Sequence, residues 1–132
     1  KEACGDARRA ATIRAVVPDD FIVLSGEDAQ TLEMLRFGAV GTISVTANVM
    51  PVQMAAFCQA WLDDDMVAVE QLDRLMQPVH AALFVETSPA PVKWGLYEMG
   101  RIQRGIRLPL VELSQARRAG LVSTLKQAGV LS

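Results

Sequence analysis

The 132-residue sequence predicts an α/β fold that changes to an all-helical one near residues 62 to 65. In the first part, short continuous apolar runs alternate with amphipathic helical patterns, which is typical of parallel βαβ units. Beyond residue 63 the strand signals disappear and only helical patterns remain. Hydrophobic residues make up 51% of the chain, which is enough for a packed core and unlike the composition of a disordered segment.

The α/β part is predicted to contain three helices and two strands. Ala10, Ile13 and Val17 recur at spacings of three and four, which is helical. Neither strand shows polar alternation, so we expect both faces of each strand to be covered. In chain order the predicted elements are helix 6–17, strand 21–24, helix 27–37 ending at Gly38, strand 41–46, and a helix capped by Asn48 that carries the apolar stripe Met54, Phe57, Cys58 and Trp61.

The second part is predicted to contain four helices, over residues 65–76, 79–84, 91–99 and 114–128. Gly100 and Gly129 stand where terminating glycines belong. The acidic run at residues 63–65 opens a helix, where negative charge is favourable with the helix dipole, and we interpret it as capping rather than as a metal site.

Charge and composition exclude several classes of function. The net charge of −2 argues against a nucleic-acid-binding surface, which needs clustered Lys and Arg. No run approaches the roughly 20 apolar residues of a membrane span, and nothing is typical of a signal peptide. Cys4, Cys58 and His80 have no metal-ligand spacing, so we expect no metal. A reducing, cytoplasmic location follows as the expectation.

Several strings occur together in a familiar order. The segment Lys1-Glu2-Ala3-Cys4-Gly5-Asp6 resembles the one that follows the sixth barrel strand of dihydrodipicolinate synthases, with Cys4 in place of the usual hydroxyl residue. The remaining strings resemble the family's seventh and eighth strand ends and its helical tail. They are Leu24-Ser25-Gly26-Glu27-Asp28, Gly41-Thr42-Ile43-Ser44-Val45-Thr46-Ala47-Asn48, Leu83-Phe84-Val85-Glu86, Pro91-Val92-Lys93-Trp94 and Arg107-Leu108-Pro109-Leu110.

This resemblance covers essentially the whole chain and implies a (β/α)₈ TIM-barrel architecture. Residues 1–62 would be the C-terminal part of the barrel, from the end of strand six to helix eight, and residues 63–132 an all-helical C-terminal domain. The family lies within the N-acetylneuraminate lyase superfamily, and the strings after Gly41 and at Pro91 favour the synthase branch. A complete barrel needs about 250 residues, so we expect this chain to be the back half of a longer polypeptide.

The resemblance also implies the site residues. Lys1 is expected to form the imine with pyruvate, Ile43 to contact pyruvate through its main chain, and Gly26 to border the substrate cleft. Condensation at the pyruvate methyl group requires a carbanion equivalent, and a protonated lysine imine supplies the electron sink for the resulting enamine. No other cofactor is implied. On position alone, Lys1 is an ordinary exposed residue, Ile43 a buried strand residue and Gly26 a turn glycine.

The function implied by the resemblance is a class I aldolase-type lyase. It condenses pyruvate with L-aspartate-4-semialdehyde to 4-hydroxy-tetrahydrodipicolinate in lysine and diaminopimelate biosynthesis. Two alternatives stay open: a related 2-oxo-acid aldolase or sialic-acid-type lyase, and a non-catalytic half-barrel if the chain is complete. The helix that follows strand seven opens with Glu27 and Asp28, which favours a substrate without phosphate. The family's helical tails imply a homotetramer.

Overall fold

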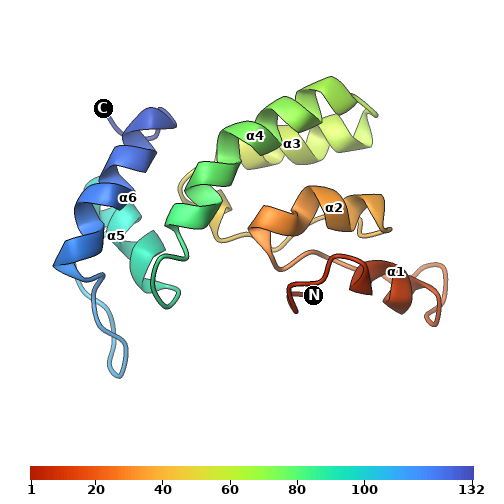
Figure 1. Ribbon diagram of the computed structural model, residues 1–132, viewed down its shortest axis with the longest axis horizontal. Coiled ribbons are helices and arrows are strands. Elements are labelled where there is room, and N and C mark those ends of the chain that lie inside the picture. Colours follow the sequence, from red (N-terminus) through yellow and green to blue (C-terminus); the bar gives the residue numbers. More distant parts are fainter. The chain divides into compact units, whose positions relative to one another are not determined.

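The computed structural model describes all residues from Lys1 to Ser132 and divides into two compact units, Lys1–Ser44 and Val45–Ser132 (Figure 1). The predicted division at residues 62 and 63 rests on a change of sequence pattern and stays a prediction. None of the helices combines the length and hydropathy that crossing a membrane requires.

Three extended segments run parallel in the first unit. Glu2 and Ser25 form one parallel bridge, and Ser25 and Thr42 form a second. The Glu2 amide donates to the Leu24 carbonyl at 2.9 Å, and the Ile43 amide donates to the Ser25 carbonyl at 2.8 Å. The two predicted strands are therefore parallel and adjacent, as expected for βαβ units, but their pairing is confined to single bridges.

The prediction of covered strand faces is wrong for several residues. Phe21 is 52% exposed and Ile22 is 65% exposed, whereas Val23 is buried. Val40 and Ile43 are also more than half exposed. The predicted strand over residues 41–46 is too long, because the chain turns into the 3₁₀ helix η2 (Thr46–Asn48). An apolar run indicates only that a segment favours burial. Here no other segment of the first unit covers these side chains, so they stay exposed.

Short helices connect the extended segments. Helix α1 (Arg9–Arg14) is followed by a turn in which the Arg14 guanidinium donates to the Phe21 carbonyl at 2.7 Å. The 3₁₀ helix η1 (Asp28–Gln30) leads directly into α2 (Thr31–Arg36). Gly38 ends α2 at φ 95°, a conformation that glycine adopts at little cost, which confirms the predicted terminator.

The second unit contains four α-helices. Helices α3 (Pro51–Leu62) and α4 (Met66–Ala82) pack together, and so do α5 (Ala90–Glu98) and α6 (Gln115–Gln127). Gly100 and Gly129 follow α5 and α6 with positive φ, as predicted. Met50 rather than the predicted Asn48 is the N-cap of α3, since the chain around Asn48 already forms η2.

Helix α4 corrects the prediction of two helices over residues 65–76 and 79–84. It continues through Pro78 as one element. A proline inside a helix removes one backbone hydrogen bond and costs about 3 kcal/mol. Buried residues on both sides of Pro78, Met76 and Val79, keep the helix continuous by packing inward. The sequence shows the proline but not the burial of its neighbours, which offsets the cost of the lost hydrogen bond.

The acidic run at residues 63–65 includes the N-cap of α4, which is Asp65. The Asp65 carboxylate accepts from the Ala68 amide at 3.0 Å, and Asp63 accepts from the Gln59 side chain at 2.9 Å. The predicted capping by this run is therefore confirmed at Asp65. No group of three His, Cys, Asp or Glu side chains is placed to hold a metal ion.

The second unit has an apolar core and a few buried or bridging polar contacts. His80 is 2% exposed, and its Nδ1 lies 2.7 Å from the Thr46 hydroxyl. Glu86 accepts from the Ser114 amide at 3.1 Å and from the Ser114 hydroxyl, which ties the chain after α4 to the start of α6. The largest fully buried side chains include Phe57, Met76, Leu83, Leu113, Leu121 and Leu125.

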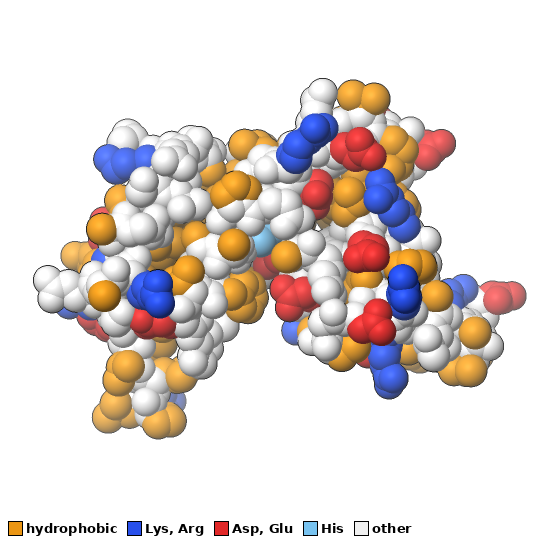
Figure 2. Space-filling model, in the orientation of Figure 1, with side chains coloured by type: hydrophobic (Ala, Val, Ile, Leu, Met, Phe, Trp, Pro, Cys, Tyr) orange, Lys and Arg blue, Asp and Glu red, His pale blue; other side chains and the backbone are white.

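The loop between α5 and α6 is anchored at its base. The Arg118 guanidinium lies 3.8 Å from the centroid of the buried Trp94 ring, and Glu112 pairs with both Arg104 and Arg118, at 2.8 and 3.2 Å. Hydrogen bonding from Arg104 lowers the pKa of Glu112. Figure 2 shows hydrophobic side chains gathered over the far end of this loop, where Leu108 and Val111 are exposed.

Candidate functional site

The register of the parallel bridges decides which side chains share a face. Glu2, Ser25 and Thr42 are aligned by the two bridges. Because side chains alternate along extended backbone, the residues next to them point to the opposite face. Lys1, Gly26 and Ile43 therefore share one face of the three segments. We call this the front face, and the face of Ser25 and Thr42 the back face.

Lys1 lies against Gly26. A Cβ atom on residue 26 would lie 2.5 Å from Lys1 Cε and 2.8 Å from Lys1 Cγ, closer than non-bonded carbon atoms approach. The absence of a side chain at Gly26 is therefore what lets the stem of the exposed Lys1 cross the end of the second segment. The structure brings together two of the three residues that the sequence predicted for the site.

Ile43 stands on the third segment with its amide already engaged. That amide donates to the Ser25 carbonyl at 2.8 Å, and the side chain is 53% exposed. A main-chain contact from Ile43 to a ligand would thus use its carbonyl group. Gly26 is similarly engaged, because its amide donates to the Glu2 carbonyl at 2.7 Å.

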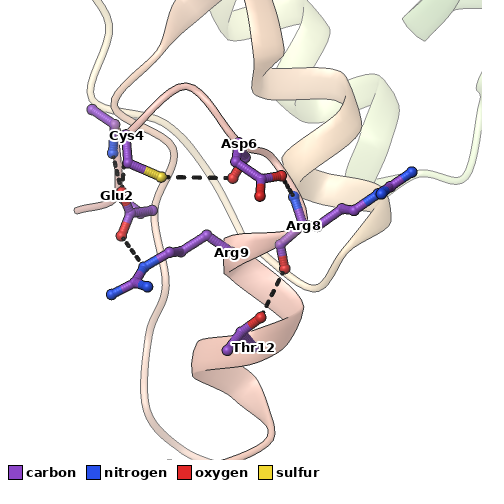
Figure 3. A network of polar contacts seen from close by, with 7 residues as sticks. Glu2, Cys4, Asp6, Arg8, Arg9 and Thr12 are labelled. Atoms are coloured by element: carbon purple, nitrogen blue, oxygen red, sulfur yellow. Dashed lines mark hydrogen bonds and ion pairs between the residues drawn. The ribbon is translucent and has the colours of Figure 1, made fainter.

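The loop that follows Lys1 is organised by one carboxylate (Figure 3). Glu2 accepts from the amides of Ala3 and Cys4, each at 2.8 Å, and its other oxygen lies 3.4 Å from Arg9 Nε. Hydrogen bonding from Cys4, first through its side chain and then through its amide, lowers the pKa of Glu2. The carboxylate thereby fixes the chain just after Lys1 and joins it to α1.

A second contact holds the same loop from the other side. The Gln30 side chain donates to the Gly5 carbonyl at 2.7 Å. Cys4 is an exposed free thiol whose Sγ lies 3.9 Å from the Asp6 carbonyl oxygen.

The back face carries a hydroxyl cluster that the sequence analysis missed. The Thr31 hydroxyl lies within hydrogen-bond distance of both the Ser25 and the Thr42 hydroxyls. Ser25 and Thr31 are buried and Thr42 is half-buried. No local pattern marks them, because they are 6 and 11 residues apart and come from three different elements.

The candidate site thus consists of an exposed lysine, a glycine beneath its stem, and backbone groups held in register behind it. A lysine amine placed in this way can attack a carbonyl carbon and form an imine. Backbone polar groups at the carboxyl ends of parallel strands commonly border ligands in α/β enzymes.

Comparison with known proteins finds similar chains. The chain is 47% identical over 131 residues to 4-hydroxy-tetrahydrodipicolinate synthase of Alcanivorax borkumensis, which covers 99% of this chain and 45% of that protein. It superposes with a TM-score of 0.93 and 39% identity on a chloride-inhibited dihydrodipicolinate synthase of Acinetobacter baumannii complexed with pyruvate, covering 99% of this chain and 45% of that one.

The dihydrodipicolinate synthase of Thermotoga maritima superposes with a TM-score of 0.95 at 37% identity, again over 99% of this chain and 45% of that one. The chain therefore spans less than half the length of the relatives it matches. The model of the dihydrodipicolinate synthetase family matches residues 1–128. A match over nearly the whole chain, together with the superpositions on barrel enzymes of this kind, shows that the chain belongs to the dihydrodipicolinate synthetase family.

Proposed function

We propose that this chain supplies the imine-forming lysine of a pyruvate-dependent class I aldolase-type lyase. The enzyme condenses pyruvate with L-aspartate-4-semialdehyde to 4-hydroxy-tetrahydrodipicolinate. Lys1 is the nucleophile, Ile43 contacts pyruvate through its main chain, and Gly26 borders the cleft. The observation that carries the proposal is the Lys1 stem lying on Gly26, on the face it shares with Ile43.

The chemistry follows from the lysine. Its neutral amine attacks the ketone carbon of pyruvate, water leaves, and a protonated imine forms. Loss of a methyl proton to a base gives an enamine, whose carbon attacks the aldehyde carbon; as this carbon–carbon bond forms, the aldehyde oxygen takes up a proton and the protonated imine on Lys1 is regenerated. Attack of the second substrate's own amine on the imine carbon then closes the ring and releases Lys1. No metal or separate cofactor enters these steps.

The position of Gly26 supports the role of Lys1. The missing side chain at Gly26 leaves room for the lysine stem to lie across the end of the second segment, on the front face. A lysine placed beside its substrate in this way favours a near-attack geometry, which contributes on the order of 7 kcal/mol to catalysis in well-oriented systems. The carboxylates at Glu27 and Asp28, which open η1, favour a substrate that carries no phosphate.

Borohydride trapping tests the proposal in the full polypeptide that carries this chain. Pyruvate with borohydride should leave a reduced pyruvyl group on the ε-amine of Lys1, located by peptide mass spectrometry. Lys1→Arg should lose both the label and the activity, since arginine forms no such imine. Lys126→Arg, a change at another exposed lysine, should retain both. Label on a different residue, or none on active protein, would contradict the proposal.

The aldehyde substrate is tested separately. Turnover of pyruvate with L-aspartate-4-semialdehyde should exceed turnover with N-acetylmannosamine or a simple sugar aldehyde. The opposite order would assign the chain to a related 2-oxo-acid aldolase or a sialic-acid-type lyase, with Lys1 in the same role.

The same proposal includes assembly as a homotetramer. Exposed apolar residues in both units, such as Phe21 and Val111, offer surface for contacts with other chains or segments. Light scattering at micromolar concentration should give the mass of four subunits. A monomer under these conditions would contradict the tetramer without touching the imine chemistry.

A further inference from the structure

We propose that the hydroxyls of Ser25, Thr31 and Thr42 form a positioning cluster, with Thr31 at its centre, that sets how the front face presents Gly26 and Ile43 to pyruvate. The inference rests on the proposed function. It adds three residues that do not touch the substrate and act through the backbone of those that do.

The contacts converge on Thr31. Its Oγ1 lies 3.2 Å from the Ser25 hydroxyl, 3.3 Å from the Thr42 hydroxyl and 3.1 Å from the Glu27 carbonyl oxygen. Thr31 is 2% exposed and Ser25 is 0% exposed, so water does not compete for these groups. A threonine hydroxyl has one proton to donate and two lone pairs to accept with, which matches a centre with three neighbours.

The cluster is joined to the front face by the Ser25 peptide. The Ser25 carbonyl accepts from the Ile43 amide at 2.8 Å and lies 3.4 Å from the Thr42 hydroxyl. The Glu27 amide donates to the Ser25 hydroxyl at 3.2 Å. This contact joins the residues on either side of Gly26 and so limits how far Gly26 can move. A rotation of the Ser25 peptide would therefore move Gly26 and Ile43 together, on the side where pyruvate is proposed to bind.

Shape alone does not account for these residue types. Valine is β-branched like threonine, so apolar packing at positions 31 and 42 would not require hydroxyls. Buried hydroxyls are costly unless they are paired, and once paired they favour a single arrangement of the groups they join. A hydroxyl cluster thus selects one register where apolar packing would permit several.

The test compares Thr31→Val with Thr31→Ser in the full polypeptide. Thr31→Val should raise the pyruvate KM and slow borohydride trapping at low pyruvate, each by about tenfold, because the contact residues lose their register. Thr31→Ser keeps the hydroxyl and should stay within about twofold of the unchanged protein. The unfolding midpoint and the pyruvate KM are measured on every variant.

Thr12→Val is the matched control. Thr12 lies in α1, is exposed, and bonds the carbonyl four residues earlier, Arg8, at 3.4 Å, just as Thr31 bonds Glu27. Thr12→Val should leave KM and trapping unchanged. If Thr31→Val fails to fold, Thr42→Val removes one arm of the cluster at a half-buried position and carries the same expectation.

Three outcomes would overturn the inference. Unchanged KM and trapping in folded Thr31→Val or Thr42→Val, with label still on Lys1, would show that the hydroxyls serve stability alone. Equal losses in Thr31→Ser and Thr31→Val would show that side-chain size matters rather than the hydroxyl. Absence of label on Lys1 in the unchanged active protein would instead overturn the proposed function, and the inference with it.

Discussion

Different kinds of interaction stabilise each of the two units internally. In Lys1–Ser44 the parallel segments are joined by backbone hydrogen bonds and hydroxyls, while Phe21, Ile22 and Val40 lie exposed. In Val45–Ser132, large apolar side chains from four helices are fully buried. The first unit carries every residue proposed for the chemistry, and the second carries none.

This difference is physically reasonable. Polar contacts are directional, so they fix backbone register to within fractions of an ångström, which a reacting site requires. Apolar burial is not directional, but it stabilises the fold by about 25 cal/mol for each Å² of apolar surface removed from water. A large buried side chain therefore contributes more than a single polar contact. We expect changes in the second unit to affect mainly stability, and changes in the first unit to affect mainly activity.

Phe57→Ala gives the strongest test of this contrast. Phe57 on α3 is 1% exposed, so its loss should leave a cavity and lower the free energy of unfolding by about 3–5 kcal/mol. Denaturant unfolding of the variant measures this. Val52→Ala on the same helix changes a residue that is 74% exposed and should cost little. Equal effects of the two substitutions would contradict the assignment of the core.

Gly26→Ala should show the reverse behaviour. Its Cβ would meet the Lys1 stem at 2.5 Å and displace the lysine, so kcat/KM should fall about tenfold or more. The unfolding midpoint should change less than kcat/KM, because the two nearest atoms belong to the flexible Lys1 stem and the Ala3 Cβ, at 3.0 Å, must give way only slightly. Steady-state kinetics with pyruvate measure the first quantity.

Gly120→Ala is the control for this substitution. A Cβ on Gly120 in α6 would meet no atom within 4 Å, so the change should leave kcat/KM unaltered and stabilise the helix by up to about 1 kcal/mol. A Gly26→Ala enzyme with unchanged kcat/KM would contradict the proposal that the glycine makes room for Lys1.

Glu86→Gln is expected to have a smaller, pH-dependent effect. Hydrogen bonds from the Ser114 side chain and amide lower the folded-state pKa of Glu86 from its ordinary value of 4.5. The group therefore stabilises the fold above its unfolded pKa, and this contribution is lost as pH falls through the lower folded-state value. Thermal unfolding between neutral and acidic pH should show a shallower acid-side loss for Glu86→Gln. Glu98→Gln, at an exposed position on α5, should leave the profile unchanged.

Much of the helical architecture was predictable because helix signals are local. Periodic apolar positions and the glycines at residues 38, 100 and 129 located the helix ends to within a few residues. The continuity of α4 through Pro78 was not predictable, since it depends on tertiary packing: Met76 and Val79 are buried, and α4 packs against α3 and α6. The predicted length of the second strand was wrong for a similar reason, because a strand continues only where a neighbouring segment pairs with it.

The site divides in a similar way. Lys1, Gly26 and Ile43 were named from strings that resemble a family, and their residue types were visible in the sequence. Thr31 was not, because nothing near it in sequence marks a threonine that meets Ser25 and Thr42. Glu86 likewise had no assignment until Ser114, 28 residues later, was found against it.

Local sequence therefore accounts for which segments are helical and where they end, since helix hydrogen bonds and caps join residues three or four positions apart. The long-range contacts account for the rest: the alignment of Glu2, Ser25 and Thr42, the Lys1 stem on Gly26, and the hydroxyl cluster behind them. Parallel pairing joins residues many positions apart, and a slip of one residue would turn each side chain to the opposite face. Only the folded backbone can specify that register, and with it the face on which Lys1 lies.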